Sequence, residues 1–241
     1  MNKSSLTKLV ILSFGLMLSI TSSRAQNIIS WNLFGHASGS SVSATTGAVP
    51  ASNWNNSPSA AVSGGPTALI LDNGAASGAS VTFDVGGAVF HNGLTPAGNS
   101  FQELYDGRGD SAGTTEVSIN VSSVPFNVYV YYAINSATAH DFTISVNGGA
   151  AVNVQPGTGI TGNTSLLTTF VENTDNGATQ SNFDVFSGLT DSTMTILTDG
   201  TDSTNNRRAI VGFQIVQVPE PGTAAMLVGG MGTLMLFRRR R

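Results

Sequence analysis

The sequence predicts an all-β fold, a β-sandwich of the jelly-roll kind, with a closed barrel as the less favoured alternative. Three observations support this prediction. Apolar and polar residues alternate in short segments, most clearly at 117–121 and 142–146, as in a strand with one buried and one solvated face. Gly, Asn, Asp and Ser separate these segments, as expected of turns. Apolar residues at helical spacing are nearly absent between residues 26 and 218.

Strands are predicted, in chain order, at 28–34, 67–71, 80–85, 117–121, 126–133, 142–146, 167–171, 194–198 and 209–218. Asn147-Gly148-Gly149 favours a β-hairpin, because Asn and Gly readily adopt the left-handed backbone of a tight turn. The stretch 35–65 is rich in Ser, Ala, Asn and Gly, which indicates a long surface excursion rather than a separate domain. No internal repeat is visible, and this counts against a propeller or solenoid.

The strand at 126–133 is apolar on both faces, with Tyr129 and Tyr131 on the side opposite Phe126 and Val128. One interpretation is a central strand whose second face is covered by a loop. The other is an aromatic platform for a sugar ring, since an aromatic face suits the C–H side of a pyranose. A shallow face carrying Trp31 or Trp54 would likewise favour sugar binding.

The N-terminus has the pattern of a signal peptide. Lys3 and Lys8 precede an apolar run at 9–20, and Ser23 and Ala25 are small residues at the −3 and −1 positions of a cleavage site. We therefore expect residues 1–25 to form a signal helix that is cleaved between Ala25 and Gln26.

The body between the two ends is strongly acidic. From residue 26 to residue 218 it contains three arginines, no lysine and thirteen Asp or Glu residues, a net charge of −10. Such a field repels phosphate backbones, so nucleic acid is excluded as a partner. It also repels acidic polysaccharide unless a divalent cation bridges the two. The chain has no cysteine, so an exported form depends on its core and not on disulfides.

The C-terminus combines three elements. Pro219, Glu220 and Pro221 give an extended, accessible segment. Residues 222–237 carry no charge and would span roughly 24 Å as a helix, a marginal length for a bilayer core of about 30 Å. The basic residues that follow favour the cytoplasmic side of a membrane, which places the body outside it; these are Arg238, Arg239, Arg240 and Arg241.

This order of tripeptide, apolar helix and basic tail resembles the PEP-CTERM sorting signal of Gram-negative-type bacteria. The resemblance covers residues 218–241 and leaves a β-sandwich ectodomain at 26–217. It implies recognition by an exosortase-type membrane enzyme, a C-terminal membrane helix that holds the chain in transit, and delivery to the cell surface or an exopolysaccharide matrix. Segments 126–131, 181–189 and 209–216 also resemble β-sandwich ectodomains attached to such signals, whose architecture is similar to carbohydrate-binding jelly rolls.

Catalytic and metal-binding patterns are sparse. Gly109-Asp110-Ser111-Ala112-Gly113 fits G-x-S-x-G, but the hydrolase elbow needs a strand before the serine and a helix after it, and neither is predicted here. The histidines that could serve such a serine are His36, His91 and His140, with Asp84 or Asp141 as the orienting carboxylate. Calcium could bind at one of two acidic pairs, Asp106 with Asp110 or Asp199 with Asp202. No other cofactor is expected.

The sequence therefore predicts an exported surface or matrix protein that is structural or weakly glycan-binding and is not an enzyme. The alternative is a secreted hydrolase of polysaccharide or peptide. Paired carboxylates in a cleft, or Ser111 beside a histidine, would favour that alternative.

Overall fold

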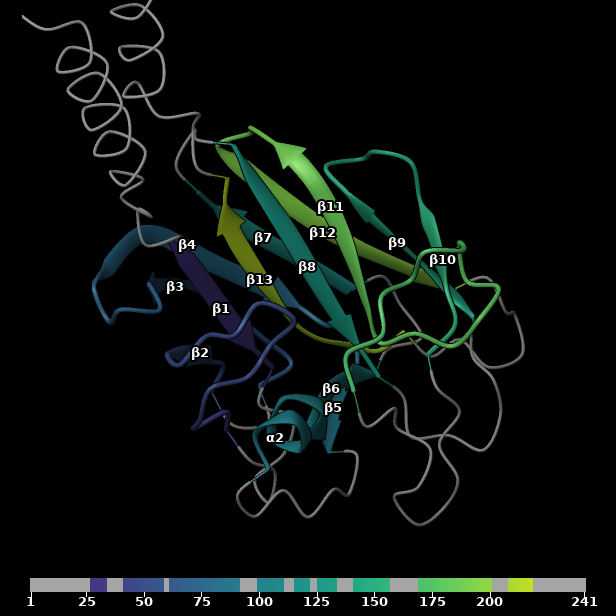
Figure 1. Ribbon diagram of the computed structural model, residues 1–241, viewed down its shortest axis with the longest axis horizontal. Coiled ribbons are helices and arrows are strands. Elements are labelled where there is room, and N and C mark those ends of the chain that lie inside the picture. Colours follow the sequence, from purple (N-terminus) through teal and green to yellow (C-terminus); the bar gives the residue numbers. More distant parts are fainter. Residues whose placement is uncertain are drawn as a thin grey trace, which may run out of the picture.

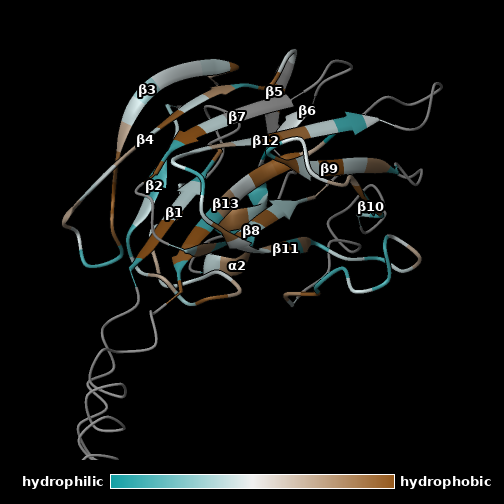
Figure 2. Ribbon diagram, turned by 90° about the horizontal axis from the view of Figure 1, so that it is seen from above, coloured by the Kyte–Doolittle hydropathy of each residue, from teal (hydrophilic) through white to brown (hydrophobic). Residues whose placement is uncertain are grey.

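The computed structural model describes residues 27–33, 41–58, 61–91, 99–110, 115–121, 125–133, 141–156, 169–200 and 208–218. In these ranges the chain forms two β-sheets that pack face to face (Figure 1), so the predicted all-β sandwich is confirmed. Figure 2 shows the sheets as two layers, with a short helix on the outer side of one of them.

The first sheet has five strands in the order β11 (Phe183–Leu189), β8 (Phe126–Tyr132), β13 (Ile210–Gln217), β1 (Ile28–Asn32) and β2 (Trp54–Asn56). The second has six, in the order β10 (Val152–Val154), β9 (Phe142–Val146), β12 (Thr193–Gly200), β7 (Thr115–Asn120), β4 (Ala76–Asp84) and β3 (Ser63–Ile70). Neighbouring strands are antiparallel except β1 and β2, which are parallel. Strands β5 (Ala88–His91) and β6 (Gly107–Asp110) form a separate two-stranded sheet. In the chain, helix α2 (Ser100–Asp106) lies between these two strands.

The chain passes repeatedly between the two layers. Strands β7, β9, β10 and β12 lie in the six-stranded sheet, whereas β8, β11 and β13 lie in the five-stranded sheet. Every connection from β7 to β13 therefore crosses the sandwich, except the hairpin between β9 and β10. Consequently, both sheets contribute side chains to one core.

Aromatic rings fill the centre of this core. Trp31 of β1 is 1% exposed. The centroid of its ring lies 5.3 Å from that of Phe83 in the six-stranded sheet and 5.4 Å from that of Phe213 in the neighbouring strand β13. Branched aliphatic residues of both sheets surround them, among them Val81, Ile119, Val128, Val130, Ile144 and Ile196. This packing removes from water the apolar face of each alternating strand, which is the main stabilising contribution in a chain without disulfides.

Most predicted strands are present with shifted ends. The Asn147-Gly148 hairpin is confirmed, since both residues have positive φ (53° and 67°) and Gly149 N donates to Val146 O at 2.9 Å. The strand predicted at 167–171 is wrong in its described part, because residues 169–171 form none. Strands β2, β5, β6, β10 and β11 were not predicted, since they are short or lack a regular alternation.

The stretch 35–65 has more contact with the core than a surface excursion would. Its residues 41–53, here called the cover segment, lie over the outer side of the five-stranded sheet (Figure 1), where Val42 and Ala51 are buried. The chain then joins the edge of that sheet as β2, in which Trp54 is buried. Helix α2 lies on the same side and was not predicted either. Asn99 caps it by accepting a hydrogen bond from Gln102 N.

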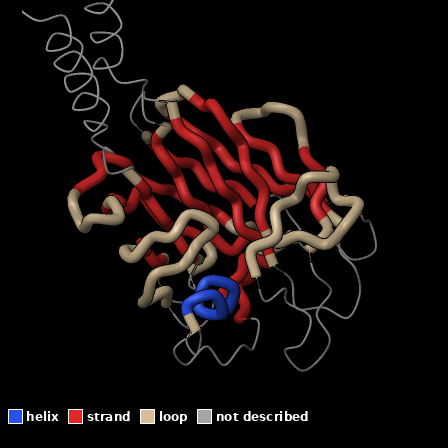
Figure 3. Tube along the Cα trace, viewed as in Figure 1, coloured by secondary structure: helices blue, strands red, loops and turns tan. Residues whose placement is uncertain are grey.

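The signal and membrane helices predicted at the two ends lie outside the described residues. Helix α2 is the only helix in the part of the chain that the structure describes (Figure 3). No helix there has the length and apolar character needed to cross a membrane.

Candidate functional site

The second face of β8 is covered and does not form an open aromatic platform. Tyr131 is fully buried beneath the cover segment, while Tyr129 keeps only part of its side chain exposed. The Tyr131 hydroxyl accepts a hydrogen bond from Ala48 N at 2.8 Å and donates one to Gln214 Oε1. Burial raises the pKa of Tyr131 far above its ordinary value of 10.0. The interpretation of a loop-covered central strand is therefore correct.

Gln214 is the second anchor of the cover segment. Its amide nitrogen donates to Val49 O at 2.8 Å and to Ser30 Oγ at 3.0 Å, and the whole residue is buried. Trp31 lies in the core and Trp54 is 6% exposed, so neither offers a flat face to a sugar. Of the aromatic rings packed beside them, those of Phe101 in α2 and Phe170 remain partly exposed and meet edge to face at 5.0 Å.

Both ends of the sandwich body lie at the same side of the molecule. Asn27, before β1, donates from Nδ2 to Gln217 Oε1 at 2.6 Å, and Gln217 N donates to Asn27 O at 3.1 Å. The start of β1 and the end of β13 therefore lie next to each other (Figure 1). We call this side the exit end. The far end is the opposite side, where β12 ends and β13 begins.

The exit end has a small cleft between the sheets. Its cavity volume is about 60 Å³. The walls are mostly apolar, and the lining includes Ile29, Leu71, Ala79, Val121, Phe126 and Ile215. A buried water needs roughly 10–15 Å³ on this measure, so the cleft admits a few waters and not a sugar ring.

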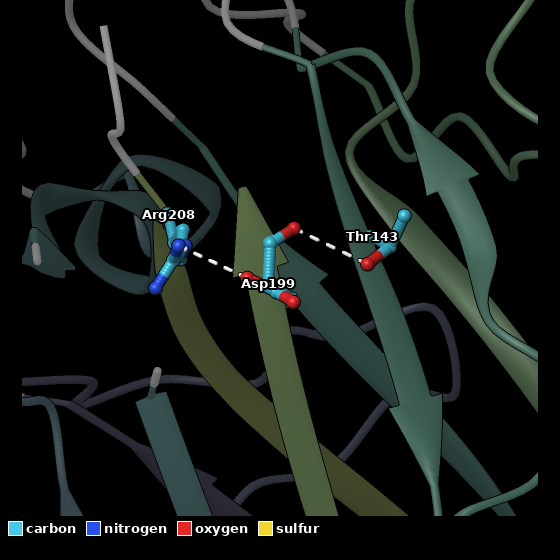
Figure 4. A network of polar contacts seen from close by, with 3 residues as sticks. All are labelled: Thr143, Asp199 and Arg208. Atoms are coloured by element: carbon cyan, nitrogen blue, oxygen red, sulfur yellow. Dashed lines mark hydrogen bonds and ion pairs between the residues drawn. The ribbon is translucent and has the colours of Figure 1, made fainter. Parts of the chain in front are cut away.

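The far end has an ion pair that links the two sheets (Figure 4). Arg208 Nη2, just before β13, lies 3.0 Å from Asp199 Oδ1 at the end of β12. The Arg208 side chain is 8% exposed and that of Asp199 72% exposed. Thr143 of β9 donates from Oγ1 to the backbone oxygen of Asp199 at 3.2 Å, which fixes this residue on its strand.

Two buried polar atoms beside this ion pair lack partners. Arg208 Nε and Thr198 Oγ1 make no hydrogen bond in the part of the chain that the structure describes. A buried donor without an acceptor costs roughly 1–3 kcal/mol. Both atoms are buried within the sandwich, so their unused hydrogen-bonding capacity is not presented at the surface.

A second polar cluster lies at the open edge between the sheets. Asp184 of β11 is buried, and its carboxylate accepts hydrogen bonds from Asn173 Nδ2 at 2.9 Å and from Val185 N at 2.8 Å. Asn173 Nδ2 also donates to Asn153 O of β10 at 2.8 Å, which joins the edges of the two sheets. Burial raises the pKa of the Asp184 carboxyl above its ordinary value of 3.8. The negative charge of the exposed Glu172 raises this pKa further, whereas the hydrogen bonds from Asn173 and Val185 lower it.

We expect Asp184→Asn to gain stability relative to the wild type when the pH is raised from acid to neutral, because the raised pKa means that the folded state favours the protonated carboxyl. The sign follows from linkage: stability declines as pH rises from the unfolded pKa through the folded pKa. The gain should vanish below about pH 3.8, where both states of the wild type are protonated. Urea unfolding at pH 3 and pH 7 measures it, with Asp191→Asn as an exposed control; equal gains at both pH values would contradict the assignment.

The structure reaches only some of the predicted site residues. The following predicted residues lie outside the described ranges: Ala25, Gln26, Pro219, Glu220, Pro221, Arg238, Arg239, Arg240, Arg241, Ser111, His36, His140 and Asp202. For His91 and Asp110 only the backbone, in β5 and β6, is described. Strand β6 ends directly before Ser111, where the sequence predicted a loop.

Each acidic pair considered for calcium is described in one member only, because Asp202 and the side chain of Asp110 lie outside the description. Asp106 is 1% exposed within α2, and Asp199 pairs with Arg208. No group of three or more His, Cys, Asp or Glu residues suited to a metal occurs within the described ranges.

Comparison with known proteins gives a few partial structural similarities. No family model matches the chain, and no curated protein matches it. An exo-β-1,3-galactanase from Phanerochaete chrysosporium with galactose is 24% identical over 42% of this chain and 21% of its own, with a TM-score of 0.24. The catalytic unit of a GH87 α-1,3-glucanase from Streptomyces thermodiastaticus is 10% identical over 59% of this chain and 26% of its own, with a TM-score of 0.28.

These neighbours require one correction. The sequence predicted that the protein is not an enzyme, whereas the similar solved structures are named as glycoside hydrolases; the prediction of a non-catalytic role is withdrawn. The chain spans only about a fifth to a quarter of the length of those proteins. The similarity therefore assigns no substrate and no catalytic residue to this chain.

Proposed function

We propose that the protein is exported, sorted through its C-terminal segment and retained at the cell surface or in an exopolysaccharide matrix, where its sandwich binds glycan. The observation that supports this proposal most strongly is the position of Asn27 and Gln217, which are hydrogen-bonded to each other at the exit end. A segment removed before residue 26 and an anchor after residue 218 would then lie on one side of the body. The far end would face away from the membrane.

The strand order agrees with this proposal. In a jelly roll, two four-stranded sheets form as the chain alternates between layers. The orders β1-β13-β8-β11 and β7-β12-β9-β10 have this arrangement, with β2, β3 and β4 added at the edges. We take the fold to be a jelly roll extended at two edges. A fold does not define an activity, so the glycan proposal depends on the far end itself.

The far end has the chemistry that a carbohydrate needs. It carries the exposed Asp199 carboxylate beside the Arg208 guanidinium. Elsewhere on the body, the rings of Phe101 and Phe170 are partly exposed at the edge of the second hydrophobic cluster. Charged groups bind hydroxyls strongly and aromatic faces stack on C–H groups.

The intact mass of the native protein tests the sorting part of the proposal. In the surface and matrix fraction we expect a chain that begins at Gln26 and ends between residues 219 and 222. A chain that keeps Arg241 and stays in the membrane pellet would contradict sorting by cleavage. It would indicate an ectodomain that remains anchored.

Polysaccharide hydrolysis is the second candidate, and the Asp184 cluster favours it. A glycosidase needs a carboxylic acid with a raised pKa and a second carboxylate near it. Asp184 has the raised pKa, and Glu172 lies close enough to contribute to it.

Release of reducing ends from the organism's own exopolysaccharide tests this activity. The release of reducing ends should be lost in Asp184→Asn and kept in Asp191→Asn. Equal release by both variants would exclude Asp184 as the general acid.

A further inference from the structure

We propose that Ser30 and Gln214 join covalently, as an intramolecular ester that ties the first strand of the sandwich to the last one. The chain has no cysteine, so an ester would give it the covalent fastening that disulfides give to other exported domains. Such a link concerns the sandwich body alone, and it is independent of the proposed sorting and glycan binding.

The two side chains lie opposite each other and are sealed from water. Ser30 of β1 pairs with Gln214 of β13 in the antiparallel register, and each residue is 0% exposed. Gln214 Nε2 donates a hydrogen bond to Ser30 Oγ at 3.0 Å. The Ser30 hydroxyl makes no other hydrogen bond among the described residues, so it keeps a proton that it can give up.

The serine oxygen is placed to attack the amide carbon of Gln214. That carbon is bonded to Nε2 at about 1.33 Å, which puts it within roughly 4.3 Å of Ser30 Oγ. Attack proceeds from separations of about 3–3.5 Å, and groups held side by side in this way react far faster than free molecules that must meet. The attack therefore needs a side-chain rotation and no movement of the paired strands.

The carbonyl oxygen of this amide already has two donors. Tyr131 donates its hydroxyl hydrogen to Gln214 Oε1, and Val49 N donates to the same oxygen at 3.4 Å. Ala48 N donates to the Tyr131 hydroxyl at 2.8 Å, which orients that hydroxyl toward the amide. Donors fixed in this way stabilise the negative charge that develops on the oxygen when an acyl carbon is attacked.

The reaction balances without any other reactant. Ser30 Oγ forms a bond to the amide carbon of Gln214, and the tetrahedral centre carries its negative charge on Oε1. The serine proton passes to Nε2, the carbon–nitrogen bond breaks, and one ammonia molecule leaves. Nothing is oxidised or reduced. Ammonia takes up a proton in neutral water and diffuses away, which opposes the reverse reaction.

The cover segment protects the ester that results. Gly47 approaches the amide so closely that a Cβ there would lie 2.6 Å from Oε1, 2.7 Å from Nε2 and 2.8 Å from Cδ of Gln214. This contact leaves no room for the water that would hydrolyse an ester. The link joins residues that are 184 positions apart, so it restricts the unfolded chain strongly.

Mass spectrometry of the folded full-length chain tests the proposal. We expect a mass lower than that of the unlinked chain by one ammonia molecule. Trypsin cuts after Arg108 and Arg208, which puts Ser30 and Gln214 in different peptides, so the ester is seen directly as a linked peptide pair. Mild alkali hydrolyses an ester and not a backbone amide, and it should separate the pair. A folded chain that shows no linked pair after prolonged incubation would overturn the proposal.

Two serine variants provide the matched pair. Ser30→Ala removes the attacking oxygen, whereas Ser187→Ala changes an exposed serine of β11. The linked peptides should be absent from the first variant and present in the second, and thermal unfolding confirms that both fold. A linked pair that persists in Ser30→Ala would overturn the proposal, because the bond would then involve another residue.

Tyr131→Phe tests the carbonyl donor and leaves both linked residues in place. The rate at which the linked pair forms after refolding of unlinked chain should fall roughly a hundredfold, as when one such donor is removed from an enzyme. Tyr105→Phe is the control, since this buried tyrosine donates its hydroxyl hydrogen to Asn182 O at 3.2 Å. Equal rates in the two variants would contradict the role of Tyr131. If Tyr131→Phe does not fold, the serine pair decides.

Discussion

Trp31→Ala should lower the free energy of unfolding by roughly 3–5 kcal/mol, the range seen when a large buried aromatic is truncated. Trp31 is 1% exposed and contacts rings from both sheets, those of Phe83 and Phe213. Its removal leaves a cavity where the layers meet, and two β-sheets cannot easily collapse around it. Urea unfolding of the full-length chain measures the loss.

Val62→Ala is the matched control for this variant. Val62 is an apolar residue with 41% of its surface exposed, and exposed substitutions usually change stability by less than about 0.5 kcal/mol. A loss below about 1 kcal/mol for Trp31→Ala would contradict the central position of this ring, since the transfer of a buried aromatic alone exceeds that value.

Gly212→Ala should be about as damaging, although it adds only one methyl group. A Cβ at residue 212 would lie 2.3 Å from the backbone oxygen of Trp31 on β1. That oxygen belongs to a strand paired with β13, so relief requires the two strands to separate. Overpacking of this kind costs roughly 1–3 kcal/mol and occasionally more, and backbone contact places this site at the upper end. A fall in the thermal midpoint measures it.

Gly149→Ala provides the comparison for Gly212→Ala. Gly149 is exposed in the hairpin after β9, and a Cβ there would come no closer than 3.1 Å, to Val146 O. We expect a much smaller loss. Equal losses for the two variants would show that the approach of β13 to Trp31 is looser than described.

The longer strands could be predicted because each carries its own pattern. Residues 142–146 alternate Phe, Thr, Ile, Ser and Val, and this strand has its predicted bounds as β9. Strand β11 has no such pattern, since Asp184 faces inward and Ser187 with Gly188 interrupts it at a bulge. Its place at the edge of the sheet depends on pairing with β8, which local sequence does not reveal.

The candidate sites were harder to predict for the same reason. Arg208 and Asp199 come from different sheets, and the carboxylate of Asp184 contacts an asparagine eleven residues earlier. Two signals were nevertheless available. Arginine is rare in so acidic a body, which singles out Arg208, and a carboxylate between Phe183 and Val185 marks Asp184. The sequence also showed that β8 is apolar on both faces, but not that residues 41–53 cover the second face.

The side-by-side position of Asn27 and Gln217 also determines how the domain responds to force. Strands β1 and β13 are antiparallel neighbours whose free ends leave together. A pull on both ends would load the ladder at its first hydrogen bond and then break the bonds one after another. Without a covalent link between these strands, the domain would open gradually under low tension instead of resisting as a sheared block.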